Sequence, residues 1–245
     1  MKRLYFLSKR NLKEMLRDPI SLIFGLCLPI VFLIVMQLAL GGVNQEGAEI
    51  FNIQNFAPST AVFGFTFTML YVALMIAGDK NTAFMQRLLV SPVKNYEYLL
   101  SYLPAALLTS VLQIVLFYIV ALFFGLTLTV STLISAIYLI VPAIFFIVLG
   151  ILIGSIANSE KQAGPLSSII ISSAGILGGL WMPIKSIGGA FETICKILPF
   201  YNCTLPSQSA MSGDYGNLLP YVWVALYSIA IIVVSFIIFN KKTKN

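Results

Sequence analysis

The sequence predicts an all-α polytopic membrane protein that forms a single transmembrane domain over residues 1–245. Of its 245 residues 59% are hydrophobic and only 10% are charged, against about 25% charged in a typical soluble domain. This composition excludes a cytosolic enzyme, and it excludes intrinsic disorder, which needs low hydrophobicity and high charge. The apolar residues form long unbroken runs, which favour membrane-spanning helices over the short alternating strands of a barrel.

Six runs are long enough to cross a bilayer as helices. We expect the spans at 20–40, 57–77, 99–124, 133–157, 165–181 and 218–239. The first starts at a favourable N-cap, Asp18, with Pro19 as its first helical residue. The uncharged stretch 98–159 is too long for one helix, so we divide it at the Gly, Thr and Ser residues of 125–132.

The basic residues predict that both termini are cytosolic. With that orientation, thirteen of the fifteen Lys and Arg residues lie inside, and only Lys185 and Lys196 lie outside. Lys and Arg accumulate in cytoplasmic loops of membrane proteins. The bias therefore supports an N-in, C-in topology with an even number of spans, in the plasma membrane of a bacterial-type cell.

The segment 1–18 is predicted to be an interfacial helix. Tyr5, Leu12 and Leu16 lie near one face, while Lys9 and Lys13 lie on another, as in helices that rest in the headgroup layer. Its apolar patch is too short for a signal peptide. A positively charged tail that only sets the topology is the alternative.

The sequence lacks the residues that proton transport, zinc or Ser-His catalysis and nucleotide binding require. The central parts of the six spans hold no Asp, Glu, Lys, Arg or His, which argues against a proton-driven carrier. The chain has no His and no Gly-Lys dipeptide, so zinc-protease, Ser-His and P-loop motifs are absent. We therefore expect no cofactor on this chain. Gly150 and Gly154 form a small-xxx-small motif that predicts a close helix contact.

Two segments are longer than simple connections. In the cytosolic loop, 82–90 can form a short helix with an apolar face, which suits a docking element for a partner groove; packing on its own bundle is the alternative. The outer segment 184–217 is apolar but broken by Pro and Gly, which suggests short re-entrant helices; an ordinary outer loop is the alternative. Cys195 and Cys203 of this segment could pair if it is extracellular, and the sequence leaves this open.

Four stretches, in this order along the chain, resemble the ABC-2 family of transporter permeases. They are Arg17-Asp18-Pro19, Arg87-Leu88-Leu89-Val90-Ser91-Pro92, Gly178-Gly179-Leu180-Trp181-Met182-Pro183 and Leu198-Pro199-Phe200-Tyr201. Asp79 and Asn81 stand where the family has two acidic residues.

The resemblance implies the membrane subunit of an ATP-binding-cassette exporter, with no catalysis of its own. Two separate ATPase subunits would carry ATP and Mg, and a second permease would complete a dimer, most simply a homodimer. Residues 79–92 would be the coupling helix. The residues expected to couple to the ATPase are Asp79, Phe84, Arg87, Leu88, Leu89 and Pro92.

Further site residues follow from the same resemblance and from the aromatic second span. Trp181, Pro183, Pro199 and Tyr201 would form an outer gate, and Phe63, Phe67 and Tyr71 are candidates for lining the transport path. The apolar spans suit an amphipathic or hydrophobic cargo, such as a drug, a peptide or a lipid-linked molecule. Membrane lipid is an expected partner and nucleic acid is not. The alternatives are a stand-alone carrier or channel-like protein without an ATPase, and a membrane enzyme acting on lipids.

Overall fold

The computed structural model describes residues 2–18, 23–40, 51–180 and 184–243, and every regular element in these ranges is a helix. In chain order these are α1 (Lys2–Arg17), the π-helix η1 (Ile23–Cys27), α3 (Leu28–Leu40), α4 (Ile53–Asp79), α5 (Ala83–Leu89), α6 (Asn95–Leu100), α7 (Tyr102–Phe123), α8 (Val130–Tyr138), α9 (Ile140–Ile156), α10 (Glu160–Leu177), α11 (Ile184–Ile187), α12 (Gly189–Ile197), α13 (Pro199–Met211) and α14 (Leu219–Thr243). The predicted all-α class is confirmed.

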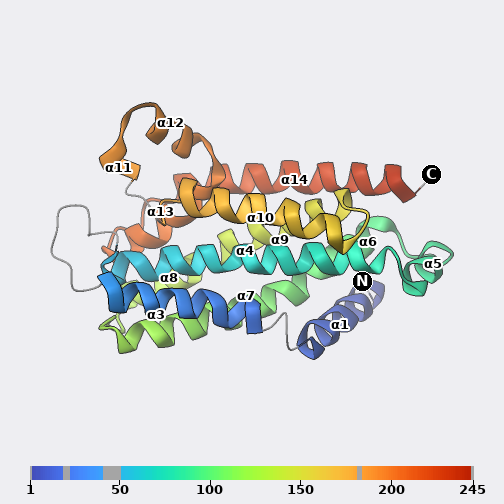
Figure 1. Cartoon of the computed structure of the whole chain (residues 1–245), viewed down its shortest axis with the longest axis horizontal. Helices are drawn as coiled ribbons and strands as arrows, with labels where there is room; N and C mark the ends of the chain where they lie inside the picture. Colours follow the sequence, from blue (N-terminus) through green and yellow to red (C-terminus); the bar gives the residue numbers. More distant parts are fainter. Residues whose placement is uncertain (1, 19–22, 41–50, 181–183, 244–245) are drawn as a thin grey trace.

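The helices α3, α4, α7, α9, α10 and α14 run along the long axis of the molecule (Figure 1). Among the described residues, four helical stretches are long and apolar enough to cross a membrane: Ile53–Asp79, Asn95–Phe123, Val130–Ile156 and Leu219–Lys242. They correspond to the predicted second, third, fourth and sixth spans.

The other two predicted spans are not confirmed. The first, 20–40, lies partly outside the described residues, and its described apolar helix, Gly25–Ala39, is shorter than a full span. The fifth coincides with α10, whose 18 residues include four serines and two glycines, so its apolar character is weaker. Small polar residues of this kind lower the hydropathy of a helix without preventing it from packing against another.

Helix ends follow local sequence signals. Asn52 accepts a hydrogen bond from the backbone N–H of Gln54 at the start of α4, and Thr129 and Thr132 form a capping box at the start of α8. Such side chains satisfy the free N–H groups of a helix N-terminus. The break between α7 and α8 contains Gly125 with φ +94°, a conformation that L side chains rarely adopt.

The contact between α4 and α9 depends on two glycines. A Cβ atom added to Gly150 would lie 2.5 Å from the carbonyl oxygen of Met69, and one added to Gly154 would lie 2.7 Å from Cβ of Ile76. Only residues without a side chain allow so close an approach. The predicted small-xxx-small contact is confirmed, and its partner is α4.

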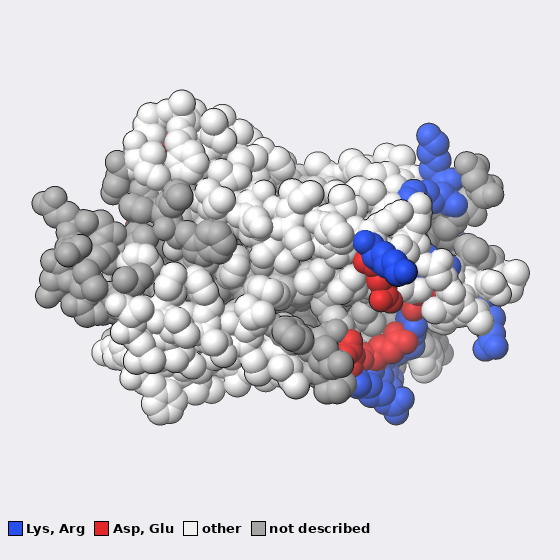
Figure 2. Space-filling view, in the orientation of Figure 1, with Lys and Arg blue, Asp and Glu red and all other residues white. Residues whose placement is uncertain are grey.

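Charge gathers at one end of the bundle, where α5, α1 and the end of α14 lie (Figures 1 and 2). We call this the inner end, following the predicted topology, and the opposite end the outer end. Between the ends, α14 exposes apolar side chains such as Leu226, Ile229 and Ile237, and α7 exposes Leu112 and Ile119. Broad exposed apolar surface of this kind suits contact with lipid.

The predicted outer segment forms α11, α12 and α13. Asn202 closes the turn between α12 and α13 by donating from Nδ2 to the carbonyl oxygens of Lys196 (2.7 Å) and Leu198 (2.9 Å). Cys195 and Cys203 are both buried and both free. The thiols therefore do not pair in this structure.

Candidate coupling site

Asp79 is the centre of a polar cluster at the inner end of α4. Its side chain is 9% exposed. Arg10 of α1 donates two hydrogen bonds to the carboxylate, from Nη1 to Oδ2 at 2.6 Å and from Nη2 to Oδ1 at 2.8 Å. The hydroxyls of Tyr102 and Tyr98 donate to Oδ2 at 2.5 and 3.3 Å. One carboxylate thus ties α1, α6 and α7 to the end of α4.

Arg10 makes further contacts that fix its position. It also pairs with Glu14 at 2.7 Å, and its guanidinium carbon lies 3.9 Å from the centre of the Phe84 ring. Burial alone would lower the pKa of Arg10, but its hydrogen bonds to Asp79 and the charge of Asp79 outweigh this and hold the pKa above its ordinary value. Arg10 is therefore a permanent cation that joins α1, α4 and α5.

The predicted coupling segment, 79–92, contains a short helix, α5, and this helix has two different faces. Met85 and Leu88 are 5% and 8% exposed and pack into the inner cluster of apolar residues that contains Met15. The opposite face carries Gln86 and Arg87, and Val90, which directly follows α5, continues it; all three are exposed, with Val90 at 87%. The side chain of Leu89 lies outside the described residues.

Hydrogen bonds hold both ends of this segment. The Thr82 hydroxyl donates to the carbonyl oxygen of Asp79 at 2.7 Å, and the Ser91 hydroxyl donates to that of Leu88 at 2.6 Å. The exposed Pro92 accepts a 2.5 Å hydrogen bond at its carbonyl oxygen from Arg3 of α1. As a result, α1 contacts the coupling segment at two places, through Arg10 and Arg3.

Two lysines cap the C-terminal end of α9 by donating hydrogen bonds to its last carbonyl oxygens. Lys80 Nζ donates to the carbonyl oxygens of Gly154, Ser155 and Ala157 at 2.7–2.8 Å. Lys242 of α14 donates to the carbonyl of Ile156 and to the side chain of Asn158. Cations stabilise the C-terminal end of a helix. Burial, together with the charge of Lys242, lowers the pKa of Lys80 to about 8.

The short helix α5 is thus connected through hydrogen bonds to the end of the long apolar helix α4. Comparison with known protein families shows which family has this sequence. The family model described as ABC-2 type transporter matches residues 2–204. This chain belongs to that family. No curated protein shows significant sequence similarity to the chain. Among the described residues, no group of three or more His, Cys, Asp or Glu side chains could hold a metal ion.

The ABC-2 match includes α1 and α5, and the structure places the predicted interfacial residues at the end of α1. Arg17 is exposed, and the N–H of Asp18 donates to the carbonyl oxygen of Glu14 at 3.1 Å. Pro19 lies outside the described residues, so the first turn of the predicted first span, which Asp18 was expected to cap, is not described.

The apolar residues of α1 were predicted to share one face, but the structure distributes them over a buried and an exposed side. Met15 is buried and Leu12 partly buried against the bundle, but Tyr5 and Leu16 are 61% and 54% exposed, on the side that also carries Lys9. The reason is that α1 packs on α6 and α7 through a face that includes the buried polar residue Asn11, whose Nδ2 donates to Ser101 Oγ at 2.8 Å.

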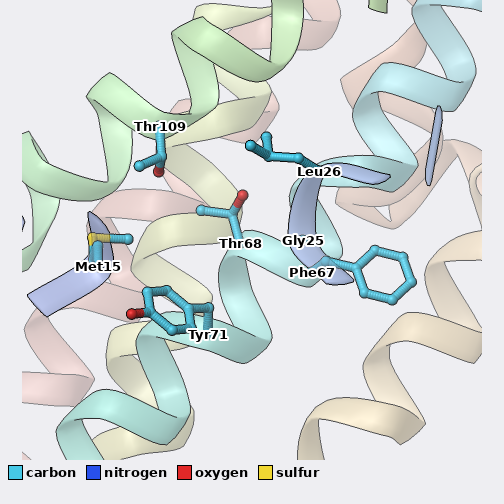
Figure 3. Close-up of a pocket in the computed structure, with 7 residues that line it drawn as sticks. All are labelled: Met15, Gly25, Leu26, Phe67, Thr68, Tyr71 and Thr109. Atoms are coloured by element: carbon cyan, nitrogen blue, oxygen red, sulfur yellow. The ribbon is translucent and has the colours of Figure 1, made fainter. Parts of the chain in front are cut away.

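The three aromatic candidates for the path of this ABC-2 protein lie in two places on α4. Phe67 and Tyr71 line a small pocket together with residues of α1, η1 and α7 (Figure 3). Phe63 is 8% exposed and packs against Phe32 of α3, with ring centres 5.8 Å apart. Phe63 therefore contributes mainly to the packing of α3 on α4 in the single chain.

The described outer-gate candidates are packed inside the protein. Pro199 is the first residue of α13 and is buried, and Tyr201 is 6% exposed against Ile184 and Cys195. Trp181 and Pro183 lie outside the described residues.

Sequence reasoning missed Arg10, Lys80, Tyr98 and Tyr102. The i, i+4 spacing of the two tyrosines does place both hydroxyls on one helix face, and that signal was available. The i, i+4 spacing to Glu14 singles out Arg10 locally, but it gives no sign of Asp79, which is 69 positions away.

Proposed function

We propose that this chain is the permease subunit of an ATP-driven exporter in the plasma membrane. In this proposal two copies form a homodimer, and two separate ABC ATPase subunits bind ATP and Mg and drive them. The cargo is an amphipathic or hydrophobic molecule, such as a drug, a peptide or a lipid-linked compound. Membership of the ABC-2 family supports the permease role, and the apolar helices support the membrane setting.

The observation that carries the proposal is the two-faced helix α5. Its inward face, with Met85 and Leu88, is anchored in the same cluster as the end of α4, whereas Gln86, Arg87 and Val90 face outward at the inner end. A partner that moved this outward face would move α4 directly through the bonds of Asp79. We therefore assign docking to the outward residues, and we assign Asp79 and Leu88 the role of transmitting the motion.

We further propose that α3 and α10 complete six spans. In Figure 1, α10 runs beside α4 along the long axis, and the two helices are in contact. Ile169 of α10 is 65% exposed, as a lipid-facing or partner-facing residue would be. Six spans keep both termini at one end, where Figure 1 shows them.

The test is co-expression of the permease with a soluble ABC ATPase of the same organism, followed by co-purification and measurement of ATP hydrolysis. Arg87→Glu combined with Val90→Asp should abolish co-purification and reduce permease-stimulated ATP hydrolysis at least about tenfold, because opposite charge and a polar group replace the outward face. Lys161→Glu makes the same charge reversal as Arg87→Glu at another exposed position, and it should leave co-purification and ATP hydrolysis unchanged.

Thermal melting of the permease should be the same for both variants, since neither site is buried. Full assembly and hydrolysis in the Arg87→Glu/Val90→Asp variant would refute the coupling assignment and favour a carrier without an ATPase.

A further inference from the structure

The exposed surface around α5 includes residues of two neighbouring segments. Arg87 lies on the outward face of α5, and Val90, Pro92 and Lys94 follow it in the turn that leads to α6; all four are exposed. Arg3 of α1 is exposed as well, and it donates to the carbonyl oxygen of Pro92 at 2.5 Å. The helix α1 therefore adds a third basic residue to this surface.

Local hydrogen bonds fix the shape of the turn. The N–H and the hydroxyl of Ser91 both donate to the carbonyl oxygen of Leu88, at 3.0 and 2.6 Å, and the N–H of Val93 donates to Ser91 Oγ at 3.3 Å. Tyr96 of α6 is 44% exposed, and its ring centre lies 5.8 Å from Lys94 Nζ. We define the docking surface as Arg3, Arg87, Val90, Pro92, Lys94 and Tyr96. A surface that is already ordered loses little conformational entropy when a partner binds.

The three cations of the docking surface have no acidic partner. None of the ion pairs between described residues includes Arg3, Arg87 or Lys94. Glu97, three residues after Lys94, accepts the backbone N–H of Lys94 at 2.9 Å instead of its ammonium group. Arg10, which lies behind α5, is in contrast paired with two carboxylates. The cations of the docking surface therefore remain available to a partner.

Apolar side chains lie among these charges. Val90 is 87% exposed, and Tyr96 adds an exposed aromatic ring beside Lys94. Protein interfaces commonly combine an apolar centre with a polar rim, and Tyr and Arg are enriched among the residues that contribute most to binding. The complementary partner surface has an apolar floor with carboxylates around it.

The position of the docking surface favours a protein partner over anionic lipid. Figure 1 places α5 and the turn after it at the inner tip of the long axis, beyond the end of α4. The helix α4 ends at Asp79 and is long and apolar enough to span the membrane. A surface beyond the end of a span faces the cytosol in the proposed topology, where a soluble protein reaches it.

We propose that the docking surface binds an acidic groove on the ABC ATPase. Carboxylates of the groove pair with Arg3, Arg87 and Lys94, and its apolar floor receives Val90 and Tyr96. This inference rests on the proposed function and adds the chemistry by which the permease selects its ATPase. An ATPase with a basic groove is rejected, because like charges face one another across the interface.

The test measures the affinity of the soluble ABC ATPase that co-purifies with the permease, with the permease held in phosphatidylcholine nanodiscs. Wild-type affinity should fall at least about tenfold between about 50 mM and about 500 mM salt, because salt screens exposed charge pairs. Arg3→Gln/Arg87→Gln/Lys94→Gln should bind at least about tenfold more weakly at the lower salt concentration and should lose most of the salt dependence.

Two further variants serve as controls. Lys13→Gln/Lys161→Gln/Lys241→Gln removes the same number of charges from other exposed positions, and it should bind like the wild type. Arg87→Gln/Lys94→Gln keeps the bond from Arg3 to Pro92, and it should still weaken binding several-fold. Wild-type affinity in both glutamine variants that alter the docking surface would overturn the proposal.

The same assay separates this inference from the proposed function. If Arg87→Glu/Val90→Asp abolished binding while the glutamine variants bound normally, the acidic groove would be wrong and α5 would remain the coupling helix. Normal binding in all of these variants would overturn both. A difference between wild type and glutamine variants that arose only after phosphatidylglycerol was added to the nanodiscs would assign the cations to lipid, and it would also overturn the acidic groove.

Discussion

The inner and outer ends of the bundle are both held by buried polar side chains, but of opposite kinds. At the inner end the bonds involve charges, with Arg10 and Asp79 at the centre and Lys80 on three carbonyl oxygens. At the outer end the Ser135 hydroxyl lies 2.8 Å from those of Tyr118 and Ser207, which joins α7, α8 and α13 without any charge.

In the coupling mechanism that we propose, the two ends would have different tasks. A buried ion pair is strongly directional and costly to break from one side, so it can transmit a displacement from α1 or α5 to α4. Neutral hydroxyl bonds are individually weaker, and a network of them can hold α13 against α8 while the charged end moves. The predictions that follow test this contrast, starting from the largest expected effect.

Asp79→Asn should destabilise the permease most. The substitution leaves Arg10 partly buried beside a neutral amide and removes the strongest acceptor for Tyr98 and Tyr102. Losing one partner of a buried pair costs about 3–5 kcal/mol, and we expect about 3 because the Arg10 side chain is 27% exposed. Thermal unfolding in detergent, followed by circular dichroism, measures the effect.

The double variant Asp79→Asn/Arg10→Gln is the matched control for that measurement. Removing both charges should recover part of the lost stability, because no unpaired ion remains. An Asp79→Asn variant as stable as the wild type would mean that the pair does not hold the inner end.

Ser135→Ala should have a smaller effect at the outer end. It removes a hydroxyl that contacts Tyr118 and the hydroxyl and backbone of Ser207, and a neutral hydrogen bond contributes about 1 kcal/mol. We expect a loss of about 1–2 kcal/mol in the same unfolding assay. If Ser135→Ala lowered the free energy of unfolding as much as Asp79→Asn, the charged bonds of the inner end would not be stronger than the neutral bonds of the outer end.

The last prediction concerns Lys80 and the dependence of stability on pH. Its pKa is lowered from 10.5 to about 8, so between these values the unfolded chain binds the proton that the folded chain has released. The wild type should therefore become less stable as pH falls from about 10 to about 8, and this dependence is complete below the folded pKa. Lys80→Met should flatten the stability profile in that window, while Lys241→Met, at an exposed tail position, should keep it.

Helix type and close packing were predictable because their causes are local. The apolar runs predicted α4, α7 and α14, and the glycines at 150 and 154 predicted a close contact, although not that α4 would be the partner. Ser91-Pro92 predicted the end of α5. The serines of α10 explain why a predicted span at 165–181 is less apolar than a full membrane helix.

The roles of the charged residues were less predictable, because they depend on pairs far apart in sequence. Asp79 was expected to couple to the ATPase; within the chain its carboxylate is bound by Arg10, Tyr98 and Tyr102, which the sequence did not predict. Leu88 was expected on a docking face, and it packs inward. Helical periodicity identifies an apolar face, but it does not say whether the protein itself or a partner covers that face.

The most direct test of the account is a photo-crosslinking measurement on α5 in the assembled transporter. Benzoylphenylalanine at Val90 should crosslink to the ABC ATPase, because this side chain is 87% exposed on the outward face. The same group at Met85, which is 5% exposed, should crosslink only within the permease. Crosslinks to the ATPase from neither position, in a complex that co-purifies intact, would contradict the claim that α5 is the coupling helix.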